Sequence, residues 1–307
     1  MEFPVALAVA QSLPELPHGP YSYEPKYDGW RAAMHVSRGR MHSRSGTDLT
    51  HRFPEVADAA DTLGDLVLDG ELVAVTGQPP RLDFAALQTG PSRRRAQGVS
   101  VHLVVFDLLS CEGTDLRGQP YHHRRGLLQQ QLQARAGGRI QLAPATTDPA
   151  AAQEWMDPAY GPVGIEGVVS KAFEGRYRGR RSGWWKTRVI TTEEAVILGV
   201  TAHAVVLGRP DHRGRWKAVG LSQPLSTALR RELADRLHAQ GDPAILPGII
   251  AGLPGSDDVT YQPTRPELVI EIRVDSALEF GRYRHQPVAV RLREDRGPGD
   301  LPALTAH

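Results

Sequence analysis

The sequence of 307 residues has a single cysteine, Cys111, and no long apolar run. One cysteine excludes an internal disulfide framework and a cysteine zinc cluster, and it is typical of a reducing compartment such as the cytoplasm. No segment approaches eighteen consecutive apolar residues, so we predict no membrane span. The N-terminus carries Glu2 and no basic segment before its short apolar run, so we expect no signal peptide. A Walker-type glycine loop is also missing.

Lysine is scarce as well, supplying only 4 of the 36 basic residues, at positions 26, 171, 186 and 217. A guanidinium stays protonated at any workable pH, whereas a lysine amine can lose its proton and attack an electrophile. Each lysine is therefore a candidate chemical requirement, although genome base composition explains the bias equally well.

Arginine is abundant and clustered, although the net charge is only +1. The basic clusters lie at 93–95, 176–188 and 282–296. Local clusters of this kind suit phosphate backbones. Taken one at a time, each cluster is better explained as solvated surface.

Hydrophobic periodicity predicts an α+β fold in two domains, 1–190 and 191–307, with a hinge over 186–192. In the first domain we predict strands at 30–36, 66–75, 101–109 and 167–170, and helices at 53–63, 84–88 and 121–136. Few long crossover helices separate these strands, so the sheets should be largely antiparallel. In the second domain we predict strands at 194–207, 215–221, 259–261 and 268–274 and one helix at 226–239. This pattern is typical of a small barrel such as an OB-fold.

The segment 24–31 (EPKYDGWR) places the amine of Lys26 just before a tight turn between two strands. Pro25 and Gly29 restrict the backbone there, so the amine can be aimed at a ligand. The pattern Lys-x-Asp-Gly is short, however, and a surface hairpin turn explains it about equally well.

Four further segments combine an apolar strand pattern with a charged or aromatic side chain: 68–73 (LDGELV), 104–109 (VVFDLL), 165–171 (IEGVVSK) and 184–188 (WWKTR). Taken alone, 104–109 is better explained as a core strand. Strand alternation places Lys186 and Arg188 on one face. Together with Lys26, these segments supply an amine, two glutamates that can hold a divalent cation, an aromatic ring and several cations. A nucleotidyl-transfer site needs those parts.

In this order the five segments resemble motifs I, III, IIIa, IV and V of the covalent nucleotidyltransferases, which include ATP-dependent DNA ligases, RNA ligases and mRNA capping enzymes. The similarity runs from about Tyr21 to the C-terminus. Segments 24–31, 43–46 (SRSG, motif Ia) and 105–109 (VFDLL) look most like bacterial ATP-dependent DNA ligases, especially small actinobacterial repair ligases akin to the ligase domain of the end-joining ligase. The resemblance implies an antiparallel, ATP-grasp-like nucleotidyltransferase domain followed by an OB-fold barrel. The implied activity is sealing of 5′-phosphate/3′-hydroxyl nicks in DNA repair through a lysyl-AMP intermediate.

The resemblance also implies a role for each candidate residue around ATP. Lys26 would form lysyl-AMP, Glu24 would contact the adenine amino group, and Phe106 would stack on the base. Glu71 and Glu166 would hold Mg²⁺ or Mn²⁺, and Lys186 and Arg188 would contact the α-phosphate. Arg31 and Glu71 would contact the ribose or a nearby phosphate, and Lys171 would contact the nucleotide. Arg31 and Arg44 would contact DNA. Arg293, in the segment 291–296 (RLREDR, motif VI), would contact the departing pyrophosphate.

The sequence departs from the family pattern in two places. Motif V usually reads Lys-x-Lys, and Arg188 stands at the second lysine, where a bidentate phosphate-binding cation can substitute. Upstream of Arg291 the segment 287–290 (PVAV) lacks the further basic residue of many relatives, which leaves the alignment around Arg284 open. Only about twenty residues precede motif I, so we expect two domains alone to grip DNA, with affinity that falls steeply with salt.

The expected partner is nicked double-stranded DNA, and some relatives work beside a Ku-like end-binding protein. We expect a monomer in the cytoplasm, associated with the nucleoid and with no membrane contact. Two alternatives remain: an RNA ligase or GTP-dependent capping-type enzyme, and an inactive nucleic-acid-binding relative. Nucleotide preference distinguishes a GTP-dependent capping-type enzyme from an ATP-dependent ligase. An inactive binding relative has no need of the intact set Lys26, Glu71, Glu166 and Lys186, which argues against it.

Overall fold

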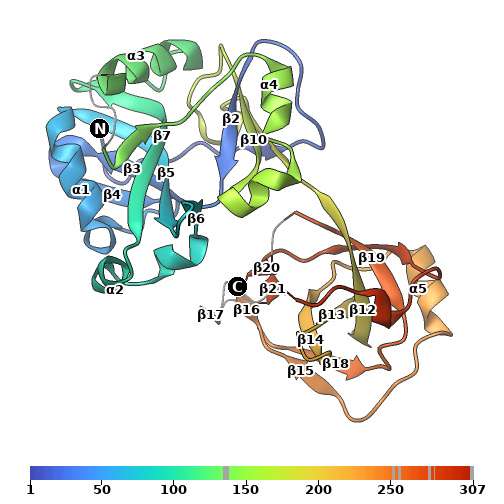
Figure 1. The fold of residues 1–307 in the computed structure, drawn as a ribbon. Coiled ribbons are helices and arrows are strands. Elements are labelled where there is room, and N and C mark those ends of the chain that lie inside the picture. The colour runs from blue at the N-terminus through green and yellow to red at the C-terminus, as the bar shows by residue number, and fades with distance from the viewer. Residues whose placement is uncertain (134–137, 251–252, 255–256, 276–277, 280, 305–307) are drawn as a thin grey trace. The chain divides into compact units, whose positions relative to one another are not determined.

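The protein is described by a computed structural model covering residues 1–133, 138–250, 253–254, 257–275, 278–279 and 281–304. The chain divides into two compact units, Met1–Val189 (unit 1) and Ile190–His307 (unit 2), which are described separately (Figure 1). Among the described residues, no helix has the length and apolar character needed to cross a membrane.

The larger sheet of unit 1 has the strand order β4-β3-β5-β7-β8, with β6 paired to β5 and β9 paired to β7. Its strands are β3 (Trp30–His35), β4 (Arg40–Ser43), β5 (Leu66–Thr76), β6 (Arg81–Leu82), β7 (Ser100–Cys111), β8 (Thr114–Asp115) and β9 (Ile140–Leu142). All pairs are antiparallel except β7 with β9. The central strands β5 and β7 are buried along most of their length, which explains their nearly continuous apolar sequences.

The smaller sheet of unit 1 has the order β1-β11-β10-β2. Its strands are β1 (Gln11–Ser12), β2 (Tyr21–Tyr27), β10 (Ile165–Ala172) and β11 (Trp184–Arg188). Strand β10 pairs antiparallel with both β2 and β11. The pairing therefore brings together three of the motif segments, which are far apart in the sequence.

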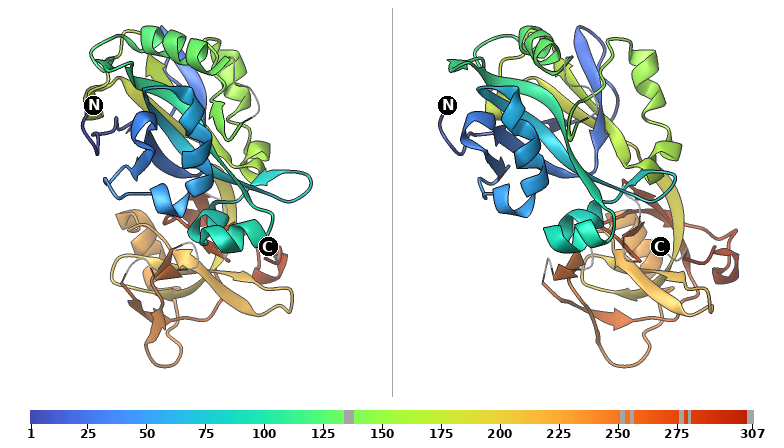
Figure 2. Two further views of the ribbon diagram at one scale, coloured as in Figure 1. Left: turned by 90° about the vertical axis from the view of Figure 1, so that its left-hand side faces the viewer. Right: turned by 60° about the vertical axis from the view of Figure 1, so that its left-hand side comes forward.

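Short helices cover the sheets of unit 1: α1 (Pro54–Ala60), α2 (Pro91–Ala96), α3 (Tyr121–Gln133) and α4 (Pro149–Glu154), together with the 3-10 turns η1 (Val36–Arg38), η2 (Thr50–Arg52), η3 (Asp61–Leu63), η4 (Phe84–Gln88), η5 (Pro158–Val163) and η6 (Gly179–Arg181). Helix α3 lies along the outside of the larger sheet against β7 (Figures 1 and 2). Its Leu128 and Leu132 enter the main core with the apolar side chains of α1.

In its described part, unit 2 contains a seven-stranded antiparallel sheet in which β12 pairs with β13, β18 and β19. The strands and other elements of unit 2 are β12 (Thr191–Val200), β13 (Val205–Pro210), β14 (Trp216–Leu221), α5 (Thr227–Ala234), β15 (Ala244–Leu246), β16 (Ile249–Ile250), β17 (Leu253–Pro254), β18 (Val259–Pro263), β19 (Val269–Val274), β20 (Leu278–Glu279), β21 (Arg282–Tyr283), β22 (Val288–Leu292) and η7 (Pro298–Asp300). One strand with three partners bends the sheet towards a barrel, and Leu229 and Leu233 of α5 pack into its core.

The predicted α+β fold with largely antiparallel sheets is confirmed, with corrections to particular elements. The strand predicted at 194–207 is wrong, because a turn at 201–204 divides it into β12 and β13. Thr201 Oγ1 accepts hydrogen bonds from the backbone N–H groups of His203 and Ala204, which stabilises that turn. The helix predicted at 226–239 begins as expected, with Ser226 as N-cap, but ends at Ala234. The helix predicted at 121–136 is described over Tyr121–Gln133, and residues 134–136 lie outside the described residues.

Candidate active site

Lys26 lies at the end of β2, next to the tight turn that leads into β3. Gly29 is required in this turn because a Cβ atom there would collide with the backbone carbonyl of Leu72 on β5 and lie 2.8 Å from Glu71 Cγ. The turn is thereby pressed against β5. The Lys26 amine is not a trailing surface group: its Nζ lies 2.6 Å from Glu166 Oε1, and only 18% of its side chain is exposed.

Glu166 is aimed at Lys26 by an irregularity in β10. The register of β10 against β2 shifts between Ile165 and Val168. Gly167 has φ +146°, and a Cβ atom on it would collide with the backbone carbonyl of Thr187 and lie 2.8 Å from Arg188 Cα. Only glycine fits that backbone, so the Glu-Gly pair is a geometric requirement for this pairing of β10 and β11.

A cavity of about 340 Å³ opens beside Lys26, within the size range of small-molecule sites. All of its lining residues belong to unit 1. Among the predicted site residues, those that line the cavity are Glu24, Lys26, Arg31, Arg44, Glu71, Phe106, Lys171, Lys186 and Arg188. Glu166 reaches the same place through its contact with Lys26. The structure therefore brings together residues that are spread over more than 160 positions of sequence.

One part of the cavity wall is strongly basic. Lys186 and Arg188 line it from β11, and Arg44 lines it from the segment after β4. Burial lowers the pKa of Lys186, and the neighbouring cations Arg188, Lys26 and Arg44 lower it further. Cations held this close together indicate a site for a polyanion such as a triphosphate, which would relieve their mutual repulsion.

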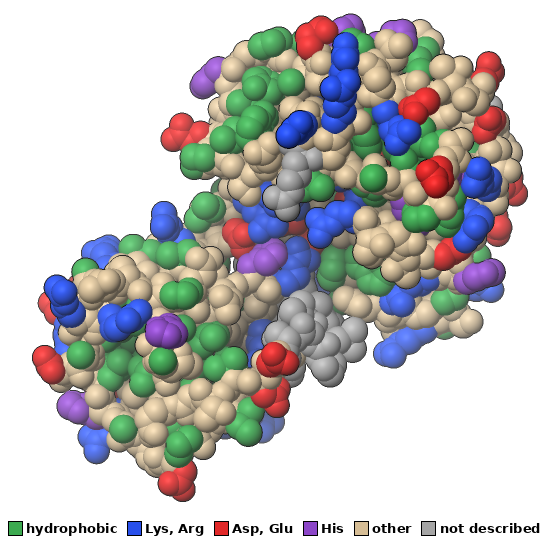
Figure 3. Space-filling view, turned by 180° about the vertical axis from the view of Figure 1, so that it is seen from behind, with side chains coloured by type: hydrophobic (Ala, Val, Ile, Leu, Met, Phe, Trp, Pro, Cys, Tyr) green, Lys and Arg blue, Asp and Glu red, His purple; other side chains and the backbone are tan. Residues whose placement is uncertain are grey.

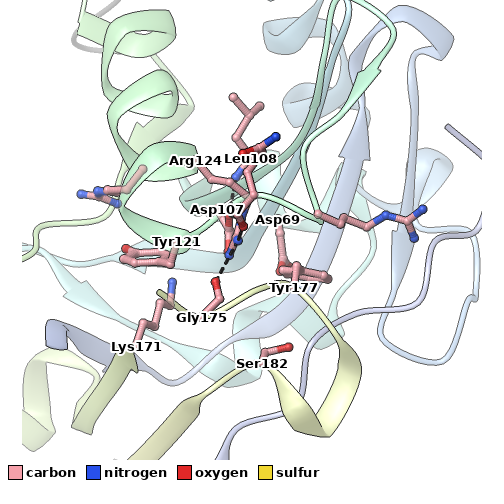
Figure 4. A network of polar contacts seen from close by, with 12 residues as sticks. Asp69, Asp107, Leu108, Tyr121, Arg124, Lys171, Gly175, Tyr177 and Ser182 are labelled. Atoms are coloured by element: carbon pink, nitrogen blue, oxygen red, sulfur yellow. Dashed lines mark hydrogen bonds and ion pairs between the residues drawn. The ribbon is translucent and has the colours of Figure 1, made fainter. Parts of the chain in front are cut away.

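Another part of the wall is a buried polar network centred on Glu24, whose carboxylate accepts from Lys171 Nζ at 2.7 Å and from the hydroxyl of Tyr121. Lys171 is only 1% exposed and also donates to the backbone carbonyl of Phe106 at 3.0 Å. Burial lowers the pKa of Lys171, and Glu24 acts in the opposite direction. Figure 4 shows the amine of Lys171 pointing towards the ring of Tyr121 on α3.

A third part of the cavity wall combines aromatic rings with cations. The Lys171 amine lies 4.3 Å from the ring centroids of both Phe106 and Trp184, and these two rings meet edge to face at 5.9 Å. The guanidinium of Arg31 lies 4.6 Å from the centroid of Phe106. A flat ring between cations is suited to binding a nucleotide base and its attached phosphates.

Arg31 reaches the cavity from β3, held by a partner that the sequence did not single out. Its Nε and Nη2 atoms each lie 2.6 Å from an oxygen of the buried Asp69, which also accepts from the hydroxyl of Tyr177 at 2.5 Å. Glu71, two residues beyond Asp69 on β5, lines the cavity. Burial raises the pKa of Glu71 to about 7, even though Arg31 and Lys26 favour its ionised form.

Behind the cavity, Asp107 and Arg124 form a fully buried ion pair that ties β7 to α3. Both carboxylate oxygens of Asp107 accept from Arg124, each at 2.8 Å, and Arg124 also donates to the carbonyls of Gln119 and Gly175. Figure 4 shows this pair above Tyr121, with Asp69 and Tyr177 beside it. The pair fixes the strand next to Phe106, and it explains the carboxylate in the otherwise apolar segment 104–109.

Arg293 is the one predicted site residue outside unit 1. Within unit 2 its guanidinium contacts Glu194, and its Nη1 lies 3.6 Å from Glu271 Oε2. Its Nε and Nη2 atoms lie 2.8 and 2.7 Å from the two oxygens of Asp295. Arg293 is thus held on the surface of unit 2, with 17% of its side chain exposed.

The sequence-based prediction missed Trp184, Val169, Asp69 and Tyr121. Trp184 and Val169 line the cavity, whereas Asp69 and Tyr121 hold residues that do. Asp69 and Trp184 stand inside recognised segments, so alternation along β5 and β11 was an available signal. Tyr121 had no such signal, because α3 carries no motif.

The residues fit a divalent cation only in combination with a phosphate ligand. In the described part of the chain, no group of three or more His, Cys, Asp or Glu side chains is arranged to hold a metal ion. Glu71 and Glu166 supply carboxylates at the cavity, and Mg²⁺ is commonly held by one or two carboxylates plus substrate phosphates. The donor set therefore suits a metal that arrives with a nucleotide.

An amine beside a carboxylate, an aromatic wall and a basic wall around one cavity suit the chemistry of nucleotidyl transfer. Comparison with known proteins is consistent with this chemistry. The family model for the ATP-dependent DNA ligase domain matches residues 4–188. DNA ligase C2 of Mycolicibacterium smegmatis is 31% identical over 329 residues, covering 95% of this chain and 91% of that protein.

Two further relatives belong to the same group. The multifunctional non-homologous end joining DNA repair protein LigD of Mycobacterium tuberculosis is 31% identical, covering 96% of this chain and 39% of that protein. The solved structure of mycobacterial DNA ligase D complexed with ATP and MES is 27% identical, covers 97% of both chains and has a TM-score of 0.52. The chain therefore belongs to the ATP-dependent DNA ligase family.

Proposed function

We propose that this protein seals nicks in duplex DNA at the expense of ATP, through an AMP group carried covalently on Lys26. The observation that carries the proposal is the position of the Lys26 amine, in the cavity and 2.6 Å from Glu166, with Lys186, Arg188 and Arg44 on the cavity wall. A surface hairpin turn, the competing explanation of the Lys-x-Asp-Gly segment, would not place the amine among these groups.

In the first step the neutral Lys26 amine attacks the α-phosphorus of ATP. A phosphorus–nitrogen bond forms, the bond from the α-phosphorus to the bridging oxygen breaks, and pyrophosphate and a proton from the amine are released. Glu166 orients the amine. Lys186 and Arg188 stabilise the negative charge that develops on the α-phosphate oxygens. Arg293 of unit 2 orients the pyrophosphate, as its place in the RLREDR segment suggests.

ATP is selected over GTP by the network around Glu24. Phe106 stacks on the base, and a carboxylate oxygen of Glu24 accepts from the adenine amino group. Guanine presents a carbonyl oxygen at the corresponding position, which the Glu24 carboxylate would repel. Lys171, Arg31 and Glu71 complete the contacts with base, ribose and phosphate.

A divalent cation, Mg²⁺ or Mn²⁺, held by Glu71 and Glu166 together with the phosphates would neutralise phosphate charge during the transfer. Because the pKa of Glu71 is about 7, this carboxyl is only partly ionised at neutral pH before ATP binds. The neighbouring Lys26 and Arg31 favour its ionised form.

In the later steps AMP passes to the 5′-phosphate of the nick, and attack by the 3′-hydroxyl then expels AMP. Arg44 and Arg31 contact the DNA at this stage. The proposed adenylation domain (1–190) corresponds to unit 1, and the proposed OB-fold domain (191–307) corresponds to unit 2. The segment 186–192 serves as the hinge about which the two domains rearrange between the first step and the later steps. The bent antiparallel sheet of unit 2 and the helix α5 that packs into its core support that assignment.

In the cell, we propose a monomeric enzyme of DNA repair in the cytoplasm, working at the nucleoid. The relative named for non-homologous end joining supports a role at breaks as well as nicks. A Ku-like end-binding protein is the partner that we propose there.

The experiment is a sealing assay on a 5′-labelled nicked duplex with ATP or GTP, using wild type and Lys26→Arg. The arginine variant keeps a positive charge near Glu166 but has no nucleophilic amine. ATP-dependent sealing by wild type only is expected. GTP-dependent activity, or sealing only of RNA ends, would place the protein with the capping enzymes or RNA ligases. No activity with either nucleotide would support an inactive binding relative.

A further inference from the structure

The turn between β13 and β14 carries positive charge that the proposed reaction does not use. Residues 209–217 (RPDHRGRWK) contain four Lys or Arg residues and one carboxylate. We call Arg213, Arg215 and Lys217 the basic hairpin, and all three are exposed. Lys217 is also the one lysine that belongs to unit 2, whereas the other three line the cavity of unit 1.

The turn of the basic hairpin is held by Asp211. Its Oδ1 accepts from the backbone N–H groups of Arg213 and Arg215, both at 2.9 Å, and its Oδ2 accepts from Arg215 Nε at 3.0 Å. Gly214, with φ +72°, supplies the left-handed residue that the turn needs. The N–H groups of Arg215 and Arg213 lower the pKa of Asp211 to about 2, so the carboxylate stays ionised and the turn stays closed at neutral pH.

Much of the charge on this hairpin is not neutralised. Arg209 is paired with Glu193 at 3.0 Å, and Arg215 shares Asp211. Within the described residues, neither Arg213 nor Lys217 forms an ion pair. Lys217 lies on β14, whose neighbouring residue Trp216 packs against the cluster of Val196, Val269 and Leu301, and Arg215 directly precedes the strand. The exposed cations thus lie in a turn held by Asp211 and at the start of a strand held by Trp216.

We infer that the basic hairpin binds the phosphate backbone of duplex DNA, with residues that do not line the ATP cavity. The inference rests on the proposed function, which requires the protein to hold a nicked duplex. Figure 3 shows one face of the molecule, on which basic and acidic side chains are interspersed. Because the net charge is only +1, affinity for DNA would come from local groups of unpaired cations such as this one. Phosphate contacts of this kind give affinity without base specificity and strong dependence on salt.

The test measures affinity for a nicked duplex in EDTA, so that no sealing occurs, at several salt concentrations between about 50 and 200 mM. The variant is Arg213→Ala/Lys217→Ala. Its matched control, Arg230→Ala/Arg231→Ala, removes two exposed arginines from α5 of the same unit. Loss of two phosphate contacts should weaken binding at least roughly tenfold near 0.1 M salt and make the slope of log K against log salt shallower by about 2.

The control should keep the wild-type slope, and so should Arg213→Lys/Lys217→Arg, which preserves the charge and reports on folding. Lysyl-AMP formation without DNA should be unchanged in all three variants. A wild-type slope in the alanine variant, or an equal loss in the α5 control, would overturn the inference. If wild type forms no lysyl-AMP and seals no nick, the proposed function fails instead, so the two failures are distinguishable.

Discussion

Replacement of Glu24 by glutamine should destabilise unit 1 and weaken ATP binding for two separable reasons. The Lys171 ammonium is 1% exposed, and among the described residues it forms an ion pair only with Glu24, at 2.7 Å. Removing one partner of a buried ion pair typically costs about 3–5 kcal/mol, because the other charge is left uncompensated. Urea unfolding of Glu24→Gln at neutral pH should show a loss of that order.

The loss should shrink as the pH rises. Burial already lowers the pKa of Lys171, and without Glu24 it should fall further below that of the unfolded chain. Between those two pKa values the unfolded state binds the extra proton, so the free energy of unfolding rises with pH. The double variant Glu24→Gln/Lys171→Met should regain most of the stability but not the ATP affinity. A single variant within about 1 kcal/mol of wild type would refute the reasoning, because that is below the cost of an uncompensated buried charge.

Two further predictions concern the backbone and the pH response of unit 1. Gly167→Ala should destabilise unit 1 by at least about 2 kcal/mol and slow lysyl-AMP formation tenfold or more, because the strained backbone displaces Glu166 or β11. The control is Gly126→Ala on α3, where an added Cβ atom meets nothing within 4 Å, and it should show neither loss. Burial, with His42 and nearby cations, lowers the pKa of His35 from 6.5 to about 4, so the unfolded chain binds one more proton in that window. The free energy of unfolding should therefore fall by about 3 kcal/mol from pH 6.5 to pH 4 through this group, and His35→Gln should lose that part of the slope in acid-unfolding measurements.

The sequence predicted the cavity well because each motif carries its own local geometry. The tight turn after Lys26 and the Glu-Gly pair at 166–167 are backbone requirements that short patterns reveal. The pairing of β2, β10 and β11 was not predicted, because alternation along a strand does not specify its partners; in the structure this pairing brings Lys26, Glu166 and Lys186 to one place.

The groups that hold the motif residues were less predictable. Tyr121 contacts Glu24 across 97 positions of sequence, and Arg124 neutralises Asp107 from a helix without any motif. A single sequence contains no local signal for such long-range partners. The turn that divides β12 from β13 was missed for another reason: its side-chain hydrogen bonds from Thr201 replace the glycine or proline that usually marks a turn.

Covalent labelling tests the central claim most directly. Wild type, Lys26→Ala and Lys26→Arg, pretreated with pyrophosphate to strip bound AMP, are incubated with Mg²⁺ or Mn²⁺ and α-labelled ATP or GTP, then separated on a denaturing gel. The account predicts a labelled band with ATP in wild type only, with the label on the peptide that contains Lys26. A band that persists in Lys26→Arg, or one that forms with GTP in preference to ATP, would contradict it.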